Sequence, residues 1–243
     1  MRHIRPVIFL ALFAVACVAH ANTIQKPGFS LSLPSGWVEI PPDVLSAMHA
    51  ELLRQAPNAK IPTYDYGFQL SAAKNWMEYP YVLVQVNQAA RIPEYQLKSL
   101  PQLDLSAKLN SRAADFKAIM SNTVLGQAQY DEAAHVVWVA SQSDVVGAGT
   151  VLGLSGLIPT EKGFIQVNGY STSSTFQNYV QTFRRIVASV SPAPDLAYKP
   201  NWVDSSRILS GIKWEQVGAK AIGGAIIGGL IALFAGLGRK KKQ

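Results

Sequence analysis

The chain has 243 residues and a formal net charge of +7, from 22 basic and 15 acidic side chains. Seven of the basic residues lie in the two terminal segments, so the central part of the chain is neutral overall and binding of nucleic acid is not expected. The one cysteine, Cys17, excludes thiolate zinc sites and a disulfide framework.

Residues 1–21 have the pattern of a secretory signal peptide. Basic residues precede an apolar stretch at 7–15, and Ala19-His20-Ala21 is a small-x-small cleavage site. The apolar stretch is shorter than the roughly 20 residues that cross a membrane. We therefore expect cleavage after residue 21, with lipidation of Cys17 as an alternative.

The first strands of the mature chain are predicted from alternating apolar and polar residues. Residues 29–33 and 37–40 alternate on either side of Pro34-Ser35-Gly36 and are expected to form a β-hairpin. Pro41-Pro42-Asp43 then indicates the start of a helix that ends at Pro57.

Two further strands, at 64–71 and 81–87, are expected to pair antiparallel across an aromatic connection. Within this connection Trp76 and Tyr79 are candidate contacts for a protein partner, or rings that pack back onto the core. A ligand-binding alternative would require the aromatic residues to line one cavity; these residues are Tyr64, Tyr66, Trp76 and Tyr81.

The next region, 93–120, is predicted to be helical with an interruption at Pro101. Two antiparallel strand pairs should follow. These pairs are 124–130 with 135–141, and 150–158 with 163–170.

The last globular element is an amphipathic helix, for which Ser174 and Gln177 predict a capping box. Its apolar stripe consists of Phe176, Val180, Phe183, Val187 and Val190. The exported domain should therefore span 22–190. A linker at 191–206 and a juxtamembrane helix at 207–220 are expected to follow.

Residues 221–238 form an uncharged, glycine-rich apolar stretch that predicts a transmembrane helix. Eighteen helical residues span about 27 Å, close to the thickness of the hydrocarbon core. The tail 239–243 begins with four basic residues, which the positive-inside rule places in the cytoplasm. We expect a single-pass membrane protein whose globular domain is periplasmic or extracellular.

Small residues recur at every fourth position of this predicted span: Gly224, Gly228, Ala232 and Gly236. Such a row lets two helices approach closely in a membrane. Two interpretations stay open. The row is either the packing face of a homo-oligomer, or it reflects only the tolerance of membrane helices for glycine.

The segment Phe29-Ser-Leu-Ser-Leu-Pro34-Ser-Gly36-Trp37, the central antiparallel strands and the closing helix with Phe176, Tyr179 and Phe183 resemble the PsbP-like α/β domain. The resemblance covers about residues 27–190. It implies a non-enzymatic accessory or binding domain of a larger assembly, and it carries over no site residues.

A hydrolase would need His135 as a base with Asp131 and a serine, but the chain has no Gly-x-Ser-x-Gly elbow. No His, Asp or Glu spacing suggests a metal site, and no cofactor motif is present.

We therefore expect an α+β fold: a predominantly antiparallel sheet covered by amphipathic helices, plus one C-terminal transmembrane helix. The expected function is non-catalytic recognition of another envelope protein by a membrane-tethered, exported domain. The alternatives are a small-molecule or lipid-binding domain and a hydrolase that uses His135.

Overall fold

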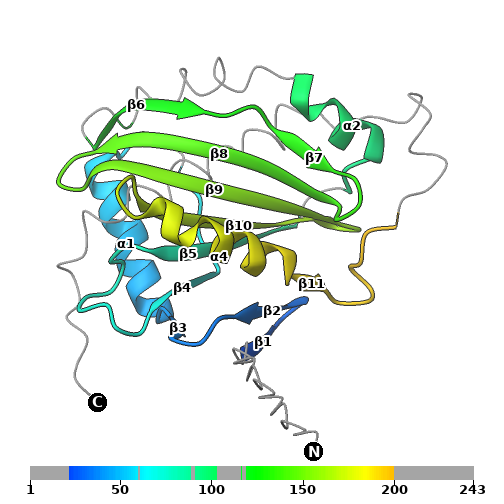
Figure 1. The fold of residues 1–243 in the computed structure, drawn as a ribbon, viewed down its shortest axis with the longest axis horizontal. Coiled ribbons are helices and arrows are strands. Elements are labelled where there is room, and N and C mark those ends of the chain that lie inside the picture. Colours follow the sequence, from blue (N-terminus) through cyan, green and yellow to red (C-terminus); the bar gives the residue numbers. More distant parts are fainter. Residues whose placement is uncertain (1–21, 60, 89–90, 103–115, 117–118, 200–243) are drawn as a thin grey trace, which may run out of the picture.

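The computed structural model describes residues 22–59, 61–88, 91–102, 116 and 119–199 (Figure 1). They form an eight-stranded sheet in the order β3-β4-β5-β10-β9-β8-β6, with β7 also paired to β8, and a three-stranded sheet in the order β1-β2-β11. Every strand pairing among the described residues is antiparallel, as predicted.

The strands of the large sheet are β3 (Trp37–Glu39), β4 (Tyr66–Leu70), β5 (Tyr81–Gln88), β6 (Met120–Leu125), β7 (Gln129–Asp131), β8 (Val136–Val145), β9 (Gly149–Thr160) and β10 (Gly163–Thr172). The strands of the small sheet are β1 (Asn22–Lys26), β2 (Phe29–Leu33) and β11 (Ser191–Pro192).

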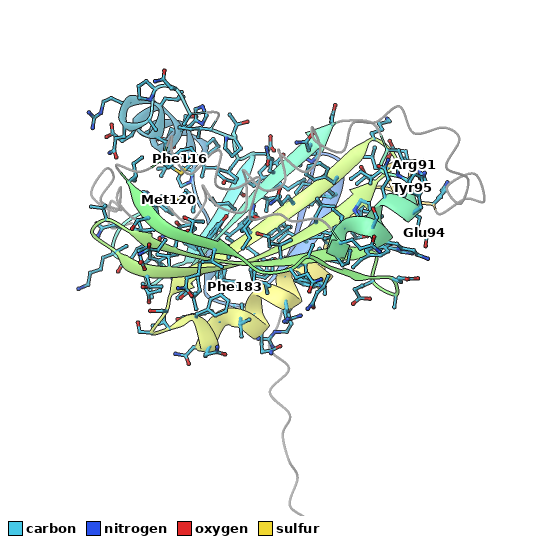
Figure 2. The ribbon with its side chains drawn as sticks, turned by 90° about the horizontal axis from the view of Figure 1, so that it is seen from above. Arg91, Glu94, Tyr95, Phe116, Met120 and Phe183 are labelled. Atoms are coloured by element: carbon cyan, nitrogen blue, oxygen red, sulfur yellow. The ribbon has the colours of Figure 1, made fainter. Side chains whose placement is uncertain are left out.

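Helices cover both faces of the large sheet (Figure 2). One face, which we call the α1/α2 face, packs against α1 (Pro42–Gln55), α2 (Glu94–Ser99) and the short 3-10 helix η1 (Leu100–Gln102). The other, the α4 face, packs against α4 (Phe176–Ala188) and the inner side of β2. The sheet is therefore the middle layer of the domain, with a separate apolar core on each side.

The helices that the sequence predicted at both ends of the domain are confirmed. Leu45, Met48 and Leu52 form the buried side of α1. The helix begins at Pro42, whose missing backbone N–H costs no hydrogen bond because N–H groups of the first turn have no acceptor within the helix. In α4, Phe183 and Val187 are buried against the sheet. The predicted capping box is wrong, because the N-cap residue is Thr175 and makes no side-chain capping bond.

The predicted hairpin between residues 29–33 and 37–40 is also wrong. The two strands exist, but β2 pairs with β1 and β11, whereas β3 pairs with β4 at the edge of the large sheet. Gly36 has a φ of +81°, a conformation that costs glycine little, and lies in the connection where the chain passes from one sheet to the other. Alternation identified the strands, but it carries no information about their partners.

The later strand pairs are confirmed, except that the strand predicted at 124–130 is divided into the end of β6 and β7, which pair with different parts of β8. The hairpins β4–β5, β7–β8 and β9–β10 form as expected. The strand predicted at 150–158 continues to Thr160, so Pro159 lies within β9 opposite Phe164. Met120, expected at the end of a helix, begins β6. Most of the region predicted to be helical, 103–115 and 117–118, lies outside the described residues.

Residues 191–199, expected to belong to a linker, lie against the folded domain. Ser191 and Pro192 form β11, and Ala197 makes a β-bridge with Thr160. The predicted signal peptide, juxtamembrane helix, transmembrane helix and basic tail lie outside the described residues. Within residues 22–199, as far as they are described, no helix is long and apolar enough to cross a membrane.

Candidate functional site

The aromatic loop before β5 is held in place by buried hydrogen bonds. The amide of Gln69 on β4 donates to Asn75 O at 2.8 Å and accepts from Met77 N at 2.6 Å. Trp76 and Tyr79 are both partly buried and pack against the core of the α1/α2 face. This geometry favours the interpretation in which the rings complete the core, and their contact with a partner stays a prediction.

Tyr79 belongs to a cluster of four tyrosines, which also includes Tyr64, Tyr81 and Tyr170. The rings of Tyr79 and Tyr81 stack with centroids 4.9 Å apart, and those of Tyr81 and Tyr170 are 5.6 Å apart. Side-chain hydrogen bonds join Tyr81 to Tyr79 and Tyr170 to Tyr64. Burial raises the pKa of Tyr81 and Tyr170 well above the usual value, because a phenolate here would lose its hydration.

The aromatic residues considered for a ligand cavity do not lie on one side of the sheet. Tyr64, Trp76 and Tyr81 belong to the α1/α2 face, whereas Tyr66 packs on the α4 face. There the Tyr66 ring lies 5.7 Å from that of Phe29, between centroids. The four rings therefore do not line one cavity. Tyr64 and Tyr66 lie on different faces because Tyr64 precedes β4 and does not follow the alternation of that strand.

A row of uncharged polar side chains crosses the middle of the α1/α2 face. This polar row consists of Gln85 on β5, Gln166 and Asn168 on β10, and Ser155 on β9. In the strand register Gln85 lies opposite Gln166, and Ser155 lies opposite Asn168. Along β10 the same face continues to Phe164 at one end and Tyr170 at the other, both members of the apolar core. The polar row is thus enclosed by apolar residues.

Asn168, which is fully buried, is the centre of the polar row. Its Oδ1 accepts hydrogen bonds from Ser155 Oγ at 2.6 Å and from Gln166 Nε2 at 2.9 Å. Its Nδ2 has no hydrogen-bond partner among the described residues, and neither has the buried Oε1 of Gln85 on the neighbouring strand. Each unmade bond of this kind costs about 1–3 kcal/mol. Asn168 therefore offers an unused donor, and Gln85 offers an unused acceptor.

His135 and Asp131, considered as parts of a hydrolase, lie on either side of the β7–β8 turn. Asp131 Oδ1 accepts bonds from two backbone N–H groups of this turn, at 3.1 and 3.0 Å. His135 Nδ1 lies 3.0 Å from the hydroxyl of Tyr130. Burial, with nearby glutamates, raises the pKa of Tyr130 to about 12, so this phenol stays protonated at neutral pH. Both residues thus have contacts that stabilise the turn.

The segment after β11 is attached to the domain by Arg91, Glu161 and Tyr198, which we call the C-terminal clasp. Arg91 Nε lies 3.0 Å from Glu161 Oε1, and its guanidinium lies 4.5 Å from the centroid of the Tyr198 ring. Arg91 Nη2 donates to Lys199 O at 2.6 Å. The Tyr198 hydroxyl donates to Ile92 O at 2.8 Å. An ion pair, a cation–π contact and backbone bonds together hold this segment.

Neither the clasp nor the polar row was recognised from the sequence. Arg91 and Glu161 are 70 positions apart, and Tyr198 lies in a Pro-rich segment that has the composition of a linker. The polar row had a signal that could have been used. Gln166 and Asn168 alternate with apolar residues within a predicted strand, which places both amides on one face.

Other candidate residues fall outside the described part of the chain. These are Cys17 and the row Gly224, Gly228, Ala232 and Gly236. Among the residues that are described, no group of three or more His, Cys, Asp or Glu side chains could hold a metal ion.

The solved structures that are similar to this chain include two proteins from different bacteria. The solution structure of cyanobacterial PsbP (CyanoP) from Synechocystis sp. PCC 6803 is 10% identical, with a TM-score of 0.48, over 75% of this chain and 98% of that chain. The crystal structure of LpqN, involved in cell envelope biogenesis of Mycobacterium tuberculosis, is 12% identical, with a TM-score of 0.36, over 72% and 91%. The first is a PsbP protein, the family that the sequence resembles.

No family model matches the sequence, and no curated protein is significantly similar to it. The function of this molecule therefore has to be inferred from its own residues.

Proposed function

We propose that this chain is an exported, membrane-tethered, non-catalytic binding domain that recognises another envelope protein. The C-terminal clasp is the observation that supports the proposal most directly. It makes the folded domain continue to Lys199, so only residues 200–220 separate the domain from the predicted span. Seven extended residues and a 14-residue helix reach about 45 Å. The tether therefore keeps the domain close to the membrane.

The clasp also gives the tether a defined point of departure from the domain. The Arg91 and Glu161 side chains are only 18% and 30% exposed, so their ion pair is better shielded from solvent than a surface pair. A domain held in this way presents a constant surface to proteins of the same membrane. The closed tyrosine cluster supports recognition through this outer surface, since Tyr81 and Tyr170 are inaccessible to a protein partner.

The topology is tested with single cysteines, because the mature chain predicted from the sequence contains none. Ala133→Cys places a thiol in the exposed β7–β8 turn, and Lys242→Cys places one in the predicted cytoplasmic tail. A membrane-impermeant maleimide should label A133C in intact cells and K242C only after permeabilisation. Labelling of K242C in intact cells, or of A133C only after permeabilisation, would contradict the proposed orientation.

Recognition of a partner is tested by photo-crosslinking of the full-length chain in its native membrane. Val124 on β6 and Val146 after β8 are large apolar residues that are each 58% exposed. Val146 directly follows β8, and Val124 is paired with Gln142 in the second half of that strand. Both therefore lie towards the C-terminal end of β8, whereas Ala133 precedes its N-terminal end. A photoreactive residue at Val124 and at Val146 should capture one common protein, which a residue at Ala133 should not capture. No capture, or equal capture at all three positions, would contradict recognition through this end of the sheet.

A further inference from the structure

We infer that the polar row on the α1/α2 face binds an uncharged, hydroxylated small molecule, a polyol or a sugar. This inference goes beyond the proposed function, which requires a protein partner but no small ligand. It depends on the unmade hydrogen bonds of Asn168 and Gln85, the absence of charge within the row, and the position of the row between the two helices.

The unmade bonds are the main evidence. Asn168 Nδ2 and Gln85 Oε1 are buried without a hydrogen-bond partner among the described residues. Buried amide groups in native proteins are nearly always satisfied, and the exceptions usually indicate a bound water, an ion or a functional role. Aliphatic residues at these two strand positions would have avoided the loss. The presence of both amides is therefore explained by a third group that binds them.

The chemistry of the row selects the class of ligand. Asn168 offers an N–H donor and Gln85 a carbonyl acceptor, and one hydroxyl group can accept from the first and donate to the second. The four side chains of the row carry no charge, so an ionised ligand would lose its hydration without a counter-charge there. These features favour a neutral, hydroxyl-bearing molecule.

The position of the row is consistent with a site between two elements. In Figure 2, α1 lies over one end of the α1/α2 face, near Phe116 and Met120, and α2 lies over the other end, near Arg91 and Tyr95. The strand register places Gln85, Gln166 and Asn168 between these ends. A ligand bound to the row would thus contact the sheet between α1 and α2.

Ligand binding is tested by saturation-transfer difference NMR with the full-length chain in lipid nanodiscs. The probes are glycerol, glucose and maltose, and glucose 6-phosphate is the charged control. At least one uncharged probe should show saturable transfer, and glucose 6-phosphate should bind at least tenfold more weakly than glucose. If no uncharged probe binds, an ordered water satisfies the two amides and the inference is overturned. Equal binding of glucose 6-phosphate would also overturn it.

Variants of β5 assign the binding to the row. Gln85→Leu removes the unused acceptor, so it should weaken binding at least tenfold without lowering the melting temperature. Gln88→Leu makes the same change at an exposed position on the α4 face of β5 and should leave binding within twofold of wild type. If Q85L does not fold, Gln85→Asn withdraws the amide by one methylene and should still weaken binding. Equal loss in Q85L and Q88L, or no loss in Q85L or Q85N, would overturn the assignment.

Discussion

Raising the pH above 10 is expected to destabilise the domain through Tyr81 and Tyr170. The pKa of each phenol is raised in the folded state by burial, while in the unfolded chain it is about 10. The folded state therefore favours the protonated form. This contribution to stability is complete below pH 10 and is lost progressively as the pH rises towards the folded-state pKa values.

The magnitude follows from the size of one pKa unit, about 1.4 kcal/mol. Each pH unit above 10 should lower the free energy of unfolding by about 1.4 kcal/mol per buried tyrosine, and by about 2.8 kcal/mol for the pair. The total stability of a domain is about 5–15 kcal/mol, so two pH units would remove a large part of it. Tyr170→Phe should reduce the slope by its own contribution of about 1.4 kcal/mol per pH unit, although loss of its bond to Tyr64 lowers stability at neutral pH as well.

The assay combines phenolate absorbance at 295 nm with far-UV circular dichroism in one alkaline titration. The chain contains nine tyrosines, and two of them should ionise only together with the loss of secondary structure. The slope is obtained from urea unfolding at pH 9, 10 and 11. The reasoning would be refuted if all nine tyrosines ionised near pH 10 in the folded protein. An unchanged pH slope in the Y81F/Y170F double variant would refute it equally.

Two further predictions concern packing and the clasp. Gly169→Ala should lower the free energy of unfolding by about 1–3 kcal/mol, because an added Cβ would collide with the ring of Phe183. The control is Gly126→Ala, whose Cβ would meet Ala140 at 3.4 Å. Equal denaturant midpoints for the two variants would contradict the prediction. Arg91→Ala should accelerate hydrogen exchange across 191–199 at least tenfold, because it removes the contacts of Arg91 with Tyr198 and Lys199 and the ion pair to Glu161, which accepts a bond from Lys199 N. Lys162→Ala is the control for R91A, since its ion pair is exposed and 3.9 Å long, and similar exchange in both variants would show that the clasp does not hold the segment.

The elements that could be predicted are those whose signal is local. The stripe of α1 and the alternation of β4 and β5 depend on residues within a few positions of one another, and both were confirmed. The partner of β2 could not be predicted in this way. Its alternating residues bury one side equally well in a hairpin with β3 or in a separate sheet with β1 and β11.

The candidate sites follow the same division. Composition and periodicity, which are properties of short windows of sequence, were enough to predict the neutral, cysteine-poor centre, the helices at both ends of the domain and the antiparallel sheet. The folded chain was needed to find that Tyr64 and Tyr66 lie on opposite faces, that Arg91 contacts Glu161 and Tyr198, and that Asn168 and Gln85 share a buried face. These contacts join residues far apart in the chain, and their energy depends on burial and geometry that exist only after the strands have paired.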